Sequence, residues 1–119
     1  MEVKKQDEFE KYDQMIQTNN DSLDKLRADR RKFEESNDDL FESIHQSFQR
    51  LRYLNDENIH FGNSANRRWQ SQNDEQEMSF KRRLKNSATN VLEAYDSEVK
   101  SIENENDELY RLRKGKQWD

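Results

Sequence analysis

The stretch His60-Phe61-Gly62-Asn63-Ser64 decides the fold, because it is the one loop-like segment in a chain of 119 residues. The chain has no proline and only two glycines, Gly62 and Gly115, so little else in it interrupts a helix. Gly62 readily adopts the positive φ that ends a helix, and Asn63 or Ser64 is suited to cap the next one. The stretch therefore predicts a turn between two helices.

Apolar side chains on both sides of this turn recur with the three- and four-residue spacing of helices that pack on helices. A connection this short makes the two helices antiparallel, and the numbers of facing residues should add up to about 126. The seam positions before the turn are Phe9, Ile16, Leu23, Ile44 and Leu51 (a) and Tyr12, Leu26, Phe33, Leu40, Leu54 and Phe61 (d); after it they are Ala88, Tyr95, Ile102 and Leu109 (a) and Leu84, Val91 and Leu112 (d).

We expect an all-α protein that forms a single antiparallel, coiled-coil-like helical hairpin. The first helix should span about residues 4–59, the turn about 60–65, the second helix about 65–113, and a short C-terminal tail 114–119. Weak helix formers in a row leave open whether the first helix is broken within residues 18–22. Polar residues interrupt the seam, so the hairpin should be marginal alone and complete a four-helix bundle with a partner. These polar residues are Asn19, Arg30, Asn37, Ser47, Asn58, Glu98 and Glu105.

Composition favours a binding protein over an enzyme. Charged residues make up 39% and hydrophobic residues 29%, which is typical of a solvated coiled coil; disorder is the competing interpretation, and the regular stripe argues against it. His45 and His60 lack a second ligand at zinc spacing, and the chain has no cysteine, phosphate loop or nucleophile elbow. We therefore expect no catalytic residue, no cofactor and no metal.

The charge distribution argues against nucleic acid as a partner. The net charge is −5, and residues 1–60 hold 10 basic and 15 acidic side chains, which phosphate backbones would repel. The cluster Lys81-Arg82-Arg83-Lys85 beside Phe80 is a solvated face or a contact for an acidic partner. No apolar run approaches the ~20 residues of a membrane span, and the N-terminus lacks a signal-peptide core. These features predict a cytoplasmic protein.

The predicted stripe is wider than two packed helices need. Position e, beside d, holds Phe41 and Phe48 in the first helix and Met78, Leu92 and Val99 in the second. A stripe widened to a, d and e belongs to a helix with more than one neighbour, so these five should form one strip on which a partner's helices lie. Trp69 is the sixth predicted contact, because exposed tryptophan is enriched in binding hot spots; the alternative is packing against Phe61.

A resemblance follows from the acidic first helix, Phe61-Gly62 and Arg68-Trp69-Gln70 around the turn, and the ending Asp107-Glu108-Leu109-Tyr110-Arg111-Leu112-Arg113. The chain resembles the WXG-type proteins of Gram-positive type VII (Esx) secretion, and more closely the small helical proteins encoded beside LXG-domain toxins. Trp69 is followed by Gln70-Ser71 rather than by the glycine of the Trp-x-Gly signature, and Tyr110 is followed four residues on by Lys114 rather than by the acid of the export signal.

The resemblance implies a non-enzymatic adaptor or chaperone that binds the N-terminal helical domain of an LXG-type toxin and helps target it for export. The missing export signal implies that another subunit supplies it, and a second small helical protein is a further expected partner. The resemblance leaves open whether the protein stays in the cytoplasm or leaves with its cargo. The alternative is a homo-oligomeric coiled-coil scaffold or spacer, in which a second copy provides the extra helices.

Overall fold

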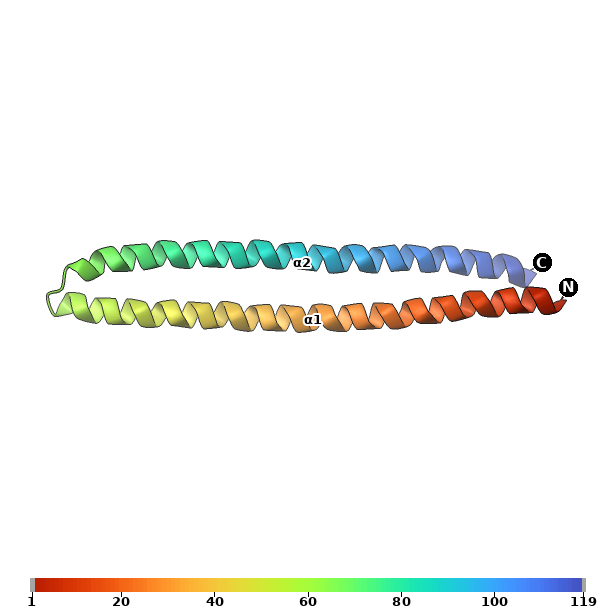
Figure 1. Cartoon of the computed structure of the whole chain (residues 1–119), viewed down its shortest axis with the longest axis horizontal. Coiled ribbons are helices and arrows are strands. Elements are labelled where there is room, and N and C mark those ends of the chain that lie inside the picture. The colour runs from red at the N-terminus through yellow and green to blue at the C-terminus, as the bar shows by residue number, and fades with distance from the viewer. Residues whose placement is uncertain (1, 119) are drawn as a thin grey trace. The chain divides into compact units, whose positions relative to one another are not determined.

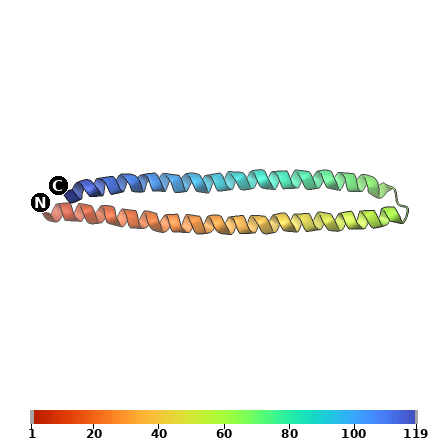
Figure 2. The same ribbon diagram turned by 180° about the vertical axis from the view of Figure 1, so that it is seen from behind.

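We describe the protein from a computed structural model, which covers the backbone of residues 2–118 and the side chains of residues 6–115. It consists of two helices, α1 (Glu2–His60) and α2 (Ala65–Trp118). The helices run antiparallel, so that the start of α1 and the end of α2 lie at the same end (Figure 1; Figure 2 shows the reverse view). The predicted all-α antiparallel hairpin is confirmed.

The turn between the helices is built around Gly62, the one residue of the described chain with a positive φ, at 95°. The Gly62 N–H donates to the Ile59 carbonyl and the Asn63 N–H to the Asn58 carbonyl, each at 3.0 Å. This pair of bonds is a Schellman motif, which satisfies carbonyls that a helix end would otherwise leave unpaired. Backbone carbonyls then start α2, since Asn63 accepts from the Asn66 N–H and Ser64 from the Arg67 N–H, both at 3.2 Å.

The helix α1 runs unbroken through residues 18–22, where the sequence left a break open. The polar side chains of this segment find partners that suit a helix. Thr18 Oγ1 donates to the Gln14 carbonyl at 3.0 Å, and Gln17 Nε2 donates to Asp21 Oδ1 at 3.0 Å. Because these side chains do not compete for the local backbone N–H groups, their low helix propensity does not end the helix.

The predicted end of the second helix at residue 113 is wrong, because α2 continues through Gly115 to Trp118. Unlike Gly62, Gly115 keeps a negative φ. A glycine inside a helix costs only about 1 kcal/mol relative to alanine, which weakens a helix without terminating it.

By its contacts the chain divides into two compact units, although the sequence predicted one. The turn-end unit is Lys32–Val91, and the open-end unit comprises residues 1–31 and 92–119. The predicted register holds in both. The pairs Arg52–Asp74 and His45–Lys81 in the turn-end unit and Arg30–Asp96 in the open-end unit each have residue numbers that add up to 126.

The open-end unit has a well-filled seam. Ile16, Leu23 and Leu109 are buried at 4–6% exposure, as predicted for seam positions. Asn19 Nδ2 donates to Asn106 Oδ1 at 2.9 Å, and Asn106 Nδ2 donates in turn to Asn20 Oδ1 at 3.0 Å. Buried asparagines that pair across a seam disfavour other registers, because a slip would leave their amides unpaired.

In the later part of α1 the seam lies one residue further along than the predicted heptad. Leu40 and Leu54 are 49% and 53% exposed, whereas Asn55, next to Leu54, is buried. A straight α-helix has 3.6 residues per turn and drifts by about 20° per heptad against a strict seven-residue repeat, so the partner comes to face the next residue. The predicted burial of Leu40 and Leu54 in the seam is therefore wrong. It is also wrong for four other exposed residues, namely Ser47, Leu51, Asn58 and Phe61.

The helix α2 shows the same drift in the open-end unit. The predicted seam residues Glu98, Glu105 and Leu112 are exposed. The residues that follow the two glutamates are the ones turned inward. Val99 is half-buried and Asn106 is buried at 5% exposure. The predicted polar seam is thus wrong for the two glutamates, and Asn106 takes the place of one of them.

A matched pair of truncations tests this register. Leu23→Ala should lower the free energy of unfolding by about 2–3 kcal/mol, because it empties a buried site. Leu40→Ala should cost less than about 1 kcal/mol, because half of that side chain is already in water. Urea unfolding of both variants, followed by circular dichroism, measures the difference. Equal losses would contradict the shifted seam.

Candidate functional site

The turn-end unit buries little apolar surface between its helices. Of its described side chains, Ala88 is the only hydrophobic one that is buried, at 8% exposure, and the other buried residues are Asn55 and Asn66. Burial of a single methyl group stabilises far less than burial of a leucine or phenylalanine side chain. Polar contacts must therefore hold much of this unit together.

A relay of side-chain amides joins the helices next to the turn. Asn66 Nδ2 donates to Asn55 Oδ1 at 2.9 Å, and Asn55 Nδ2 donates to Gln70 Oε1 at 3.1 Å. Gln70 Nε2 donates to Asp74 Oδ1 at 2.7 Å, and Asp74 also accepts from Arg52 Nη2 at 2.8 Å. Asn66 is 2% exposed and its Oδ1 has no hydrogen-bond partner. The relay fixes the register at the turn at some cost in stability.

One side of the turn-end unit is closed by charged groups, and we call it the ion-paired side: His45, Arg52, Asp74, Glu77 and Lys81. Lys81 Nζ lies 2.6 Å from Glu77 Oε2 and 2.9 Å from His45 Nδ1. The hydrogen bond from Lys81 holds the pKa of Glu77 below its ordinary value against the opposing effect of burial, and His45 and Arg52 add to the lowering. A carboxylate kept charged in this way is poorly suited to general acid catalysis near neutral pH.

The other side of the turn-end unit is apolar. Neighbours in an α-helix point about 100° apart, and here they divide between the two sides. His45 and Lys81 belong to the ion-paired side, whereas Ile44 and Phe80 line a groove of about 220 Å³ together with Ser43, Ser47 and Phe48. The rings of Phe48 and Phe80 meet at a centroid distance of 6.2 Å. The groove therefore lies between α1 and α2, opposite the ion pairs.

Further apolar residues continue this surface at helical spacing. Leu40, Leu51 and Leu54 share the flank of Ile44 at intervals of three, four or seven residues, and Leu84 follows Phe80 by one turn. Leu40, Leu51, Leu54 and Phe80 are each between 42% and 53% exposed. We call this surface the apolar side: Leu40, Ile44, Phe48, Leu51, Leu54, Trp69, Phe80 and Leu84.

Trp69 lies on the apolar side because it precedes Phe80 by eleven residues, which is three helical turns. It is 51% exposed. Within the described residues it makes no hydrogen bond and no ring contact. Phe61, its alternative partner from the sequence, packs its ring against His60 at 5.6 Å instead. Trp69 is thus available for a partner, and its contact with one stays a prediction.

Of the other five predicted contacts, three belong to the turn-end unit and two to the open-end unit, and the single strip that they should form stays a prediction. In the turn-end unit, Phe41 lies under Lys81 at 5.3 Å, Phe48 packs on Phe80, and Met78 is 62% exposed. Leu92 and Val99 are half-buried in the open-end unit. The apolar side consists largely of leucines that the sequence assigned to the seam, together with Phe80. The drift of a straight helix against the heptad is the signal that would have identified them.

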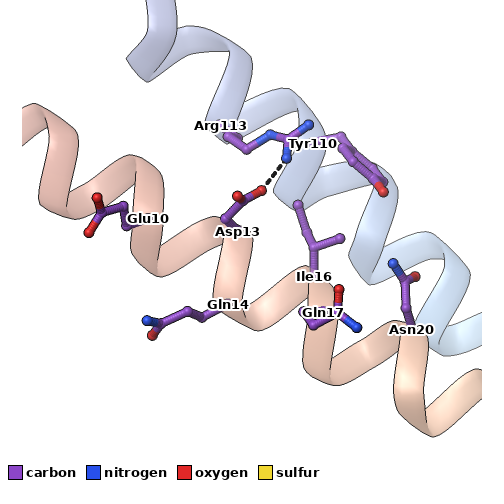
Figure 3. Close-up of a pocket in the computed structure, with 8 residues that line it drawn as sticks. All are labelled: Glu10, Asp13, Gln14, Ile16, Gln17, Asn20, Tyr110 and Arg113. Carbon is purple, nitrogen blue, oxygen red and sulfur yellow. Dashed lines mark hydrogen bonds and ion pairs between the residues drawn. The ribbon is translucent and has the colours of Figure 1, made fainter.

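A polar groove of about 490 Å³ lies in the open-end unit (Figure 3). Arg113 of α2 points toward Asp13 of α1 and pairs with it. Its guanidinium also lies 4.9 Å from the centre of the Tyr110 ring and 5.5 Å from that of Phe9. The charge is therefore satisfied within the chain, and the cluster clamps the helices together. The groove is lined by Glu10, Asp13, Gln14, Ile16, Gln17, Asn20, Tyr110 and Arg113.

Neither a metal centre nor a membrane span is present in the part of the chain that the structure describes. No three of its His, Cys, Asp or Glu side chains converge to hold an ion. None of its helices combines the length and the hydropathy needed to cross a bilayer. Comparison with known proteins finds no matching family model, no matching curated protein and no matching solved structure.

The lowered carboxylate pKa values predict a loss of stability in acid. The pKa of Glu77 is lowered chiefly by Lys81, and that of Asp74 is lowered chiefly by the hydrogen bond from Arg52. Their stabilisation is present above the unfolded-state pKa of about 4 and is lost as the pH falls through the lower folded-state values. The urea midpoint should therefore fall between pH 5 and pH 3.

Glu77→Gln should cost about 1 kcal/mol at pH 7 and should flatten this pH dependence. Glu75→Gln is the matched control, because Glu75 is exposed on the same helix and makes no ion pair. Urea midpoints at pH 7, 5 and 3 compare the two variants with the parent chain. If Glu77→Gln kept the parent's full pH dependence, the ion pairs of Glu77 would contribute nothing to it.

Proposed function

We propose that this protein is a non-enzymatic helical adaptor, or chaperone, that binds the N-terminal helical domain of an LXG-type toxin and helps target it for type VII export. One observation carries the proposal, namely that the apolar side of the turn-end unit is exposed while the opposite side is closed by ion pairs. A contiguous apolar patch of this kind on a small protein marks an interaction site. The sequence resemblance supplies the identity of the partner.

A helical partner suits this surface better than a globular one. The apolar side chains follow helical spacing on both α1 and α2, so the surface is a strip with the groove at Phe80 between its two rows. An amphipathic helix places its own apolar residues at the same spacing and can fill such a groove. A helical domain that does so would complete the bundle which two helices leave open.

Co-expression with the N-terminal domain of an LXG-type toxin whose gene lies beside that of this protein tests the function. A tag on either protein should recover both at ordinary salt, because burial of the apolar side does not depend on screened charges. Recovery of the tagged protein alone would refute the proposed function. A stable homo-oligomer that keeps its mass in light scattering when the toxin domain is added would favour the scaffold alternative.

Trp69→Ala should weaken the complex by about 1 kcal/mol or more, the usual effect of losing an interface hot spot. The melting temperature of the free protein should hardly change, because Trp69 is half exposed and makes no polar or ring contact. Tyr110→Ala is the control, since Tyr110 is an aromatic residue of similar exposure, at 43%, that belongs to the open-end unit and not to the apolar side. Calorimetric titration with the toxin domain measures both. Equal losses of stability and binding would instead make Trp69 a structural residue.

A further inference from the structure

Arg83 is an unpaired positive charge on the border of the apolar side. It follows Phe80 by three residues, so it lies beside Phe80 on the same flank of α2. Within the described residues its guanidinium makes no hydrogen bond and no ion pair. The other residues along this border of α2 are uncharged: Gln72, Gln76, Ser87 and Asn90.

The acids of this part of α2 do not balance that charge. Residues 65–91 hold six basic and three acidic side chains. Asp74 and Glu77 are paired on the ion-paired side, with Arg52 and Lys81. Glu75 lies one residue after Asp74 and makes no ion pair. The border of the apolar side is therefore locally positive, although the whole chain has a net charge of −5.

A helix that covers Phe80 also removes water from Arg83, because residues three apart lie next to each other on one flank of a helix. An arginine that loses water without gaining an acceptor weakens the binding that buries it. The docked helix must therefore provide a carboxylate at this position, and a basic group there would add repulsion to the lost hydration. The basic neighbours of Arg83 also attract an acidic helix before contact.

We propose that the apolar side docks an amphipathic helix whose flank next to α2 carries Asp or Glu, which pairs with Arg83. The proposal rests on the proposed function and specifies the chemistry of its partner. The leucine row from Leu40 to Leu54 extends for about 22 Å, so about four turns of the partner helix occupy the site. The acidic flank sets the orientation of that helix, and the apolar residues provide most of the affinity.

Two synthetic peptides of about 20 residues test the proposal with the full-length protein. Both carry the same leucine and isoleucine stripe; one is flanked by glutamates and the other by lysines. Fluorescence anisotropy at low salt should give a Kd at least tenfold lower for the glutamate-flanked peptide. Overall charge favours the opposite order, since the protein carries −5. Phe80→Lys should abolish binding of both peptides.

Arg83→Glu should remove or reverse the preference for the glutamate-flanked peptide. Arg82→Glu makes the same change in charge on the neighbouring residue, which points about 100° away, and should keep the preference. Circular dichroism checks that both variants remain helical. Equal affinities for the two peptides, tighter binding of the lysine-flanked one, no binding of either at 1 mM, or a preference unaffected by Arg83→Glu would overturn the proposal.

Light scattering of the free protein tests whether a second copy of the chain covers the apolar side instead of an acidic helix. A stable dimer that Phe80→Lys converts to monomer would show that a second copy covers the apolar side, and this would overturn the proposal.

The outcomes also separate this proposal from the proposed function. A toxin domain that co-purifies equally well with Arg83→Glu leaves the function in place and refutes the acidic flank. If the peptides bind as expected but the toxin domain does not bind, the acidic-flank proposal stands and the proposed function is refuted.

Discussion

Two α-helices that pack only on each other offer each apolar side chain one neighbour, and this limit determines how the protein is held together. In the open-end unit Ile16, Leu23 and Leu109 fill the seam. In the turn-end unit the seam is one residue out of phase with the leucines, so Leu40 and Leu54 point partly into water. The helix keeps its geometry because its backbone hydrogen bonds outweigh the gain from twisting to follow a strict heptad.

Polar groups supply the specificity that the sparse core lacks. The asparagine contacts at residues 19, 20 and 106 and the contacts of Asn55 with Asn66 and Gln70 pair side chains across the seam in one register. The ion-paired side adds contacts of the same kind, and Lys81 lies over the Phe41 ring while it holds Glu77. The contacts that cross between the helices would be lost if one helix slid by a turn, whereas Gln70–Asp74 and Lys81–Glu77 lie within α2.

The sequence was sufficient for features that depend on backbone geometry and chain direction. The glycine at position 62 located the turn, and the short connection gave antiparallel helices whose register followed from the centre of that turn. It was insufficient where the outcome depended on small angular differences. A drift of about 20° per heptad accumulates until the partner faces Asn55 rather than Leu54. The predicted end of the second helix before Gly115 was wrong for another reason. A glycine ends a helix only where the chain after it departs from the helical path, and here α2 continues.

The candidate site was partly accessible from the sequence for the same reasons. Trp69 was recognisable by its chemistry, and the structure leaves half of it exposed. The leucines of the apolar side were recognisable as hydrophobic but were assigned to the wrong neighbour. The difference between Ile44 and His45, or between Phe80 and Lys81, emerges only when both helices are placed side by side.

The closure of one side by charge has a consequence for the proposed complex. A hairpin with apolar surface on both flanks could bridge two partners, and repeated bridging produces open-ended chains. In the turn-end unit the described ion pairs lie opposite the apolar side. A partner that docks on the apolar side, as proposed, would therefore have one such surface per unit, and an excess of partner would saturate that surface without extending it into a polymer.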